Sequence, residues 1–232
     1  LLSYALEYAF AGRVDPVLMH TTNIMLHAVN TVLVFLVGRR LLNDHWGGVR
    51  VALLFALHPM HVESVAWISE RKDLLYTLFL LLSLLCYMRF MDERRGGMYA
   101  LSLLLFICSL LSKSAAAAMA PLLFVVDHLQ GRSVTLRSGL EKLPFLGLAV
   151  AFGIIALSSQ STAMEESFAP HFPWSQRPVI ALYALAFYTV RFFVPYGQSA
   201  LHTYPLDPGD PMTPLAGPAT GVLLVMGAVL FL

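Results

Sequence analysis

Two histidines and a carboxylate are the residues of this chain best suited to chemistry. His58, His61 and Glu63 lie close together in a polar segment, residues 58–73, that separates two apolar stretches. Two imidazoles and a carboxylate could ligate a divalent metal ion, orient a sugar or move a proton. The spacing is not the HExxH pattern of zinc proteases, so it does not select a metal over the other two roles. We treat these three residues as candidate substrate-pocket residues and as possible metal ligands.

Cations follow in the same segment and recur once further along the chain. Arg71 and Lys72 come directly before Asp73, and Lys113 stands between two serines. Arginine binds a phosphate through bidentate hydrogen bonds from its planar guanidinium group, and lysine acts as a point charge. The three cations are therefore candidate ligands of an anionic group. The alternative is that they extend toward lipid headgroups. Asp73, a further candidate pocket residue, is expected in the first turn of the next helix, where the helix dipole favours a carboxylate.

A polar stripe marks the first long apolar stretch. His20, Asn23, His27 and Asn30 are spaced three, four and three residues apart, which puts them on one helical face. Because polar side chains are costly in lipid, this face must look into a helix bundle or a wet cavity. Interhelical hydrogen bonds and substrate lining both remain open. His20, nearest the end shared with segment 58–73, is the candidate pocket residue.

Composition requires that these residues be positioned by membrane helices. Of 232 residues, 58% are hydrophobic and only 12% are charged, and the mean hydropathy is +0.70. Soluble domains carry about 25% charged residues. Uninterrupted apolar runs lack the alternation of a barrel strand, so helices are expected. The net charge of +1 gives no general attraction to nucleic acid.

The predicted fold class is an all-α integral membrane bundle of seven to eight spans. Pro59 disfavours helical geometry at His58, so a helix should end there and a short one begin. Pro121 is expected to kink its span. The predicted spans are residues 17–38, 49–57, 74–90, 98–111, 115–126, 143–157, 179–194 and 215–232.

The distribution of basic residues predicts which loops share a face. Lys and Arg prefer the cytoplasmic side of short loops. Every second loop is basic, which leaves segments 58–72 and 112–114 on the outer face, periplasmic or lumenal. Arg71, Lys72 and Lys113 are then basic on the side where few cations are expected, which favours a phosphate site. The basic loops contain Arg39, Arg40 and Arg50, then Arg89, Arg94 and Arg95, then Arg132, Arg137 and Lys142.

Three stretches resemble a known family. They read HTTNIMLHAVN, LLFALHPMHVESVAWISERKDLL and LLSKSAAAAMAPLLFVVDHLQGR. They look like the membrane part of the transmembrane and tetratricopeptide-repeat O-mannosyltransferases and their bacterial relatives, which are glycosyltransferases of the GT-C superfamily. The resemblance covers roughly residues 1–132. His58, His61, Glu63, Arg71, Asp73 and Lys113 fall on its motif positions.

The resemblance implies a transferase that moves a sugar from a polyprenyl-phosphate donor to a protein or glycan acceptor, in a bacterial inner membrane or the endoplasmic reticulum. It places the acidic catalytic base in a loop upstream of Leu1 and a repeat domain after the membrane part. Residues 1–232 are therefore expected to be one polytopic domain, cut at both ends and inactive by itself. A transporter or flippase for a lipid-linked or anionic substrate is the alternative, and a non-catalytic scaffold is the third.

Overall fold

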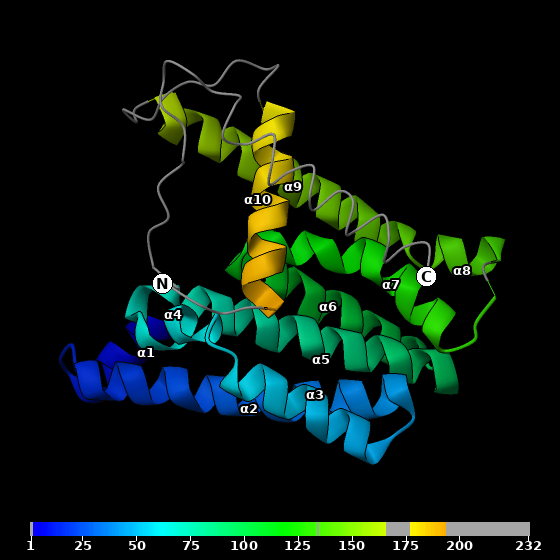
Figure 1. Ribbon diagram of the computed structural model, residues 1–232, viewed down its shortest axis with the longest axis horizontal. Coiled ribbons are helices and arrows are strands. Elements are labelled where there is room, and N and C mark those ends of the chain that lie inside the picture. The colour runs from blue at the N-terminus through cyan, green and yellow to red at the C-terminus, as the bar shows by residue number, and fades with distance from the viewer. Residues whose placement is uncertain (1, 134, 166–176, 194–232) are drawn as a thin grey trace. The chain divides into compact units, whose positions relative to one another are not determined.

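The computed structural model describes residues 2–133, 135–165 and 177–193 (Figure 1). The chain divides into two compact units, Leu1–Thr162 and Ala163–Leu232, which are described separately. Every regular element in the described ranges is a helix, which confirms the all-α expectation. The predicted span at residues 215–232 lies outside the described residues.

The first unit opens with a short helix and a long one, each placed by a recognisable signal. Helix α1 covers Leu2–Ala11, and α2 covers Pro16–Leu42. The Asp15 carboxylate accepts hydrogen bonds from the Val17 and Leu18 amides, and Pro16 occupies the first helical position. An aspartate cap followed by proline satisfies amides that a helix start leaves without partners.

Helix α3, His45–Leu57, folds back along α2. Asp44 caps it in the same way through the Trp46 and Gly47 amides. Gly48 allows the two backbones to meet, because a Cβ at this position would lie 2.8 Å from the Arg39 nitrogen. The helix starts four residues earlier than the predicted span at 49–57, since the cap and not the apolar run sets its beginning.

The polar segment forms a break between two helices, as Pro59 predicts. His58 ends α3 in extended geometry, and a short helix α4, His61–Ala66, begins two residues after the proline. A single 3-10 turn, η1 at Ile68–Glu70, leads into α5, Arg71–Glu93. Asp73 lies in the first turn of α5, as expected.

Helix α6, Gly96–Ser112, packs along α5, and the two are fastened inside the bundle by serines. The Ser83 hydroxyl donates to the Ser102 carbonyl at 2.6 Å, and the Ser102 hydroxyl donates to the Ser83 carbonyl at 2.8 Å. Small hydroxyl residues let membrane helices approach closely and hydrogen-bond across their interface. Figure 1 shows α2, α3, α5 and α6 with their long axes roughly aligned.

The next part of the first unit differs from the expected kinked span. Residues Ser114–Ala118 form a 3-10 helix, η2, and α7 covers Met119–Leu129. Pro121 therefore lies in the first turn of α7, where its missing amide is no loss, instead of in a helix interior where it would produce a kink. A short helix α8, Leu136–Leu140, precedes α9, Leu143–Glu165.

An ionic network lies where α5, α7, α8 and α9 meet, at the end opposite segment 58–73. Asp127 is 2% exposed and accepts from the Tyr87 hydroxyl at 2.9 Å and from the Lys142 ammonium at 2.5 Å. Arg132 pairs with Glu141 at 2.5 Å beside them. The network adjoins the apolar core, whose buried members include Leu84, Met88, Phe106, Met119, Leu123, Val126 and Phe145.

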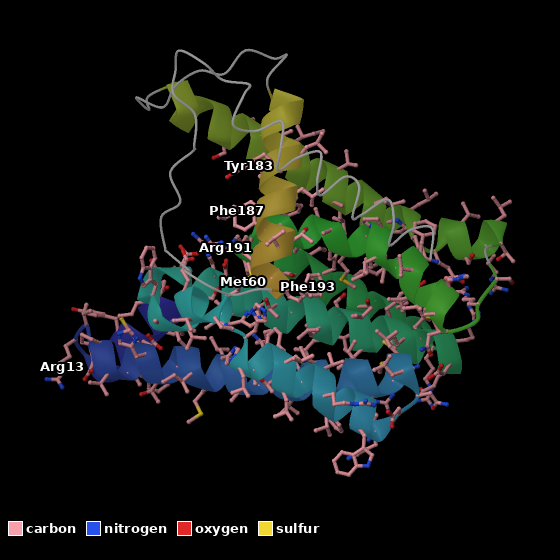
Figure 2. The ribbon with its side chains drawn as sticks, viewed as in Figure 1. Arg13, Met60, Tyr183, Phe187, Arg191 and Phe193 are labelled. Atoms are coloured by element: carbon pink, nitrogen blue, oxygen red, sulfur yellow. The ribbon has the colours of Figure 1, made fainter. Side chains whose placement is uncertain are left out.

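Besides the last three residues of α9, the described part of the second unit is helix α10, Arg177–Phe193. Tyr183, Phe187 and Arg191 follow one another at four-residue spacing along its side (Figure 2). The Tyr183 and Phe187 rings stack at 6.0 Å, and the Arg191 guanidinium lies 5.1 Å from the Phe187 ring. Residues 177–193 coincide closely with the predicted span 179–194.

By length and composition, three helical segments in the described ranges could cross a membrane: Pro16–Leu42, Ile68–Glu93 and Leu136–Ser159. Four further apolar helices are shorter, at His45–Leu57, Gly96–Ser112, Ser114–Leu129 and Ala181–Phe193. The chain is therefore a helical membrane protein. The seven to eight spans predicted from apolar runs include these shorter helices, which a count by length leaves out.

Candidate functional site

One end of the first unit gathers polar residues from distant parts of the sequence. The Tyr4 hydroxyl of α1 donates to the Ile68 carbonyl, which fixes α1 against segment 58–73. Lys113, at the end of α6, reaches Asp73 at the start of α5. The structure thus brings segment 58–73 and Lys113 together, as the distribution of basic loops predicts.

Arg71 is enclosed by protein groups. Its side chain is 0% exposed, and its Nε donates to Asn23 Oδ1 at 2.8 Å while Nη2 donates to the Met19 carbonyl at 2.9 Å. Its Nη1 lies 2.8 Å from Glu7 Oε2, an ion pair whose alignment does not make a hydrogen bond. The Tyr4 ring covers the guanidinium at 4.5 Å. All three guanidinium nitrogens are engaged, so Arg71 holds α1, α2 and α5 together.

Glu7 is the partner that sequence reasoning missed. Burial raises the pKa of this carboxyl, but the Arg71 guanidinium and the Thr22 hydroxyl outweigh burial and bring the pKa below its usual value. Glu7 is thus ionised opposite a buried cation. Its position in the middle of an otherwise apolar ten-residue helix is the signal that could have identified it.

Asp73 and Lys113 form a second pair at this end. Lys113 Nζ lies 2.5 Å from Asp73 Oδ1, and the side chains are 36% and 22% exposed, respectively. The Ser64 hydroxyl of α4 donates weakly to the other Asp73 oxygen at 3.4 Å. The pair is accessible from solvent and ties α5, α6 and α4 at one point.

Lys72 differs from Arg71 in being half exposed. Its ammonium makes a 3.2 Å ion pair with Glu70, and exposed ion pairs of this kind contribute little to stability. The Lys72 ammonium is therefore exposed and has only a weak ion-pair partner.

Lys72 also lines a groove between α1, α5 and α6 with a volume of about 750 Å³. The apolar walls come from all three helices, and polar residues lie along α1, where α5 begins and where α6 ends. Phe79 is seven residues beyond Lys72, about 10 Å deeper along α5. We call this the α1 groove. Its apolar lining includes Leu2, Leu6, Leu75, Phe79 and Leu111, and its polar lining consists of Ser3, Tyr4, Ser69, Arg71, Lys72 and Ser112.

The histidines pack against each other and against an aromatic ring. His61 lies 4.3 Å from the Phe55 ring, 5.6 Å from His27 and 6.1 Å from His58, measured between ring centroids. Burial, reinforced by His27 and His58, lowers the pKa of His61 to about 4. His58 accepts a hydrogen bond from the Met60 amide at 3.2 Å. His61 is thus a neutral packing residue at physiological pH.

The proposed metal ligands are not assembled into a cluster. Among the described residues, no group of three His, Cys, Asp or Glu side chains is arranged to hold a metal ion. Glu63 is exposed on α4, while His61 faces Phe55. Glu63 is also distinctive among the described carboxylates of this end, because Glu7, Asp15, Glu70 and Asp73 all have ion-pair partners and Glu63 has none.

The polar stripe of α2 is used mainly for interhelical hydrogen bonds. The Asn23 amide donates to the Val65 and Trp67 carbonyls, each at 3.3 Å, and the Asn30 amide donates to the Leu74 carbonyl at 2.9 Å. His27 Nε2 lies 3.2 Å from the Ala56 carbonyl. His20 is exposed, outside this bonded set. The structure therefore gives three of the four stripe residues a bonding role.

Comparison with known protein families shows the family to which this chain belongs. A family model described as dolichyl-phosphate-mannose-protein mannosyltransferase matches residues 12–159. The chain belongs to the dolichyl-phosphate-mannose-protein mannosyltransferase family. The matched residues include α2 to α7 and most of α9, and hence Asp73, Lys113 and the cations beside them.

Curated relatives in this family agree. Protein O-mannosyl-transferase Tmtc1 of Drosophila melanogaster is 42% identical over 116 residues, 50% of this chain and 13% of the relative. Protein O-mannosyl-transferase tmtc2 of Xenopus laevis is 32% identical over 209 residues, 83% of this chain and 24% of the relative. The chain thus spans less than a quarter of the length of these relatives. No solved structure matches it.

Proposed function

We propose that this chain forms the donor-binding part of a membrane glycosyltransferase that takes a sugar from a polyprenyl phosphate. The observation that carries the proposal is the α1 groove, which has apolar walls and, at its polar end, the buried Arg71, the half-exposed Lys72 and two serine hydroxyl groups. The apolar walls suit a polyprenyl chain, and the cationic, hydroxyl-bearing end suits its phosphate. The names of the relatives make mannose the sugar and a protein hydroxyl the acceptor in this proposal.

Each residue of the site has a part in the proposal. Lys72 would bind the donor phosphate as a point charge, and Lys113 would assist from the Asp73 pair when the sugar phosphate bond breaks. Arg71 would act as a positioning residue, because it holds α1 as one wall of the groove. Glu63, exposed and unpaired, is our candidate for contact with the sugar.

We place the polar end of the α1 groove on the lumenal or periplasmic side. The opposite end contains the arginines of the first three basic loops and the Asp127 network, as expected for a cytoplasmic face. The transporter alternative has lost its main support, because Asn23, His27 and Asn30 bond to backbone carbonyls instead of lining a path through the bundle.

The test measures donor binding to the full-length protein in detergent micelles. Lys72→Gln should weaken the binding of a polyprenyl phosphate roughly tenfold, the lower end of what a charge-assisted hydrogen bond contributes. Leu75→Trp should fill the apolar wall and also weaken binding. Arg13→Gln is the matched control, since Arg13 is 78% exposed, is absent from the groove lining and projects from the loop between α1 and α2 (Figure 2).

Leu75→Trp tests contact with the polyprenyl chain of the donor, and Lys72→Gln tests contact with its phosphate. A polyprenyl phosphate that binds Lys72→Gln and Leu75→Trp as tightly as the unaltered protein would refute the donor site. Equal weakening by Arg13→Gln would also refute it, because the effect would then reflect the charge of this face and not the groove.

A further inference from the structure

A second cleft lies at the opposite end of the first unit from the α1 groove. It has a volume of about 990 Å³ and is formed by the ends of α2, α5 and α7 and the start of α3. Three arginines and several leucines line it, among them Arg39, Arg40, Arg89, Leu36, Leu85 and Leu129. We propose that this cleft binds the headgroup of an anionic phospholipid. The proposal does not depend on the function proposed above.

The depth of the cleft suits a lipid headgroup. Helix α2 has 27 residues and is about 40 Å long, whereas the hydrocarbon layer is about 30 Å thick. Arg39 is 23 residues beyond Pro16, about 35 Å along the helix. With the start of α2 near one interface, Arg39 reaches headgroup level at the other. Leu36 and Leu85, about one turn before Arg39 and Arg89 on their helices, then lie at the level of the first acyl carbons.

The charges in the cleft leave one arginine available. Arg40 is paired with Asp92, and Arg89 is paired with Glu93 at 3.1 Å. Arg39 is exposed and has no ion pair with a described carboxylate; its guanidinium lies 5.5 Å from the Phe35 ring. Arg39 is therefore the cation with which an incoming phosphate would pair.

Two carboxylates, Asp44 and Asp92, line the cleft, and both already have partners. The Asp44 carboxylate accepts from the Trp46 and Gly47 amides and pairs with Arg50 at 3.1 Å. Helix C-termini disfavour an anion, but the carbonyls here are partly neutralised. The Arg40 guanidinium donates to the Met88 carbonyl at 2.6 Å, and the Gln130 amide donates to the Arg40 carbonyl at 3.3 Å.

The backbone of Arg39 is held in place by the crossing of α3 against α2. Gly48 of α3 crosses α2 directly beside it, so that a Cβ at Gly48 would lie 2.8 Å from both the Arg39 nitrogen and its Cβ. A close helix crossing restrains the backbone of Arg39, and a preorganised cation loses less entropy on binding. Basic pockets between membrane helices are a known mode of anionic headgroup recognition.

The experiment compares short-chain lipids as ligands of the full-length protein in a neutral detergent. Dioctanoyl phosphatidylglycerol should raise the midpoint of thermal unfolding at concentrations where dioctanoyl phosphatidylcholine does not. Arg39→Gln should weaken phosphatidylglycerol binding roughly fivefold, the contribution of one cation near an anionic surface. Asp92→Asn should strengthen it, since the substitution frees Arg40 from its partner.

Arg137→Gln is the matched control, because Arg137 is basic, 86% exposed, and absent from the cleft lining. Its binding of phosphatidylglycerol should be unchanged. Equal shifts with phosphatidylcholine, equal shifts with inorganic phosphate, or equal loss in Arg39→Gln and Arg137→Gln would each overturn the proposal. If Arg39→Gln does not fold, Asp92→Asn still decides, because unchanged or weaker binding in that variant contradicts the assignment.

Discussion

Arg71 and Lys72 are neighbours in the sequence and have different environments in the fold. Adjacent helical residues point about 100° apart, so the Arg71 guanidinium is buried against Glu7 and Asn23, whereas the Lys72 side chain is half exposed at the α1 groove that both residues line. Sequence reasoning assigned both to one phosphate. The sequence identifies the cations but not the direction in which each side chain projects, because that direction depends on the residue at which η1 ends and α5 begins. Because Arg71 is buried and Lys72 is half exposed, we assign Arg71 a positioning role and keep Lys72 as the candidate phosphate ligand.

At this same scale, His61 should make stability depend on pH. The pKa of His61 in the folded chain is about 4, below its ordinary value of 6.5. Between these two pH values the unfolded chain binds a proton at His61 and the folded chain does not. Stability contributed by neutral His61 should be complete above pH 6.5 and be lost as the pH falls from about 6.5 to 4. Thermal unfolding midpoints measured at pH 7 and pH 5 check this.

His61→Gln removes the titrating group while keeping a polar side chain of similar length. The difference between the midpoints at pH 7 and pH 5 should shrink in this variant. An undiminished difference would assign the pH dependence to another group. Glu7 contributes little to the difference between the midpoints at pH 7 and pH 5, because its lowered pKa restricts its own effect on stability to pH values below about 4.5.

At the scale of elements, the sequence holds local signals for helix starts, although the predicted spans followed the apolar runs and placed the start of α3 four residues late, and it holds no such signal for helix contacts. Asp15 before Pro16, and Asp44 before α3, are capping signals that a reader can find without coordinates. The break at Pro59 was predicted for the same local reason. The docking of α1 depends on an ion pair between residues 64 positions apart, and no local pattern announces such a contact. The 3-10 form of Ser114–Ala118 was likewise unforeseen, since four alanines favour an α-helix.

Helix α1 should depend on Glu7 for its position. It has no buried residue, and Phe10 is 90% exposed, so apolar packing within the described unit holds it weakly. Glu7→Gln leaves the Arg71 cation buried without its countercharge, a change that costs about 3 kcal/mol in comparable buried pairs. We expect amide hydrogens of residues 2–11 to exchange faster in this variant, as measured by mass spectrometry.

Arg13→Gln serves as the comparison for α1 as well. The Arg13–Asp15 pair is exposed, and such pairs contribute little, so exchange in α1 should remain as in the unaltered protein. Unchanged exchange in Glu7→Gln would show that other contacts hold the helix in place.

At the scale of the first unit, the Asp127 network fastens the chain between α7 and α9 to the core of α5. Lys142 and Arg132 come from the connection that follows α7, and Tyr87 comes from the middle of the bundle. Sequence reasoning placed Arg132 and Lys142 in a basic cytoplasmic loop. It did not foresee that Lys142 is buried, because positive charge near a membrane is ordinarily exposed.

Asp127→Ala should therefore destabilise the whole unit. It leaves the Lys142 ammonium buried without its carboxylate, and breaking a buried pair in this way costs about 3–5 kcal/mol. Tyr87→Phe removes one hydrogen bond to the same carboxylate and should cost about 1 kcal/mol. Reversible unfolding in mixed detergent micelles measures both. Similar losses in the two variants would mean that the ion pair contributes little beyond the hydrogen bond.

The shortness of α3 has a consequence for the bilayer. Its 13 residues reach about 20 Å, roughly 10 Å less than the hydrocarbon thickness, while α2 beside it is about 40 Å long. The α3 to α4 junction consequently lies at the level of His27, about 16 Å along α2 from Pro16. Local thinning of the bilayer around α3 would relieve the hydrophobic mismatch on this flank. Water and headgroups would then reach His58 and Glu63 at a depth where a flat bilayer holds only acyl chains.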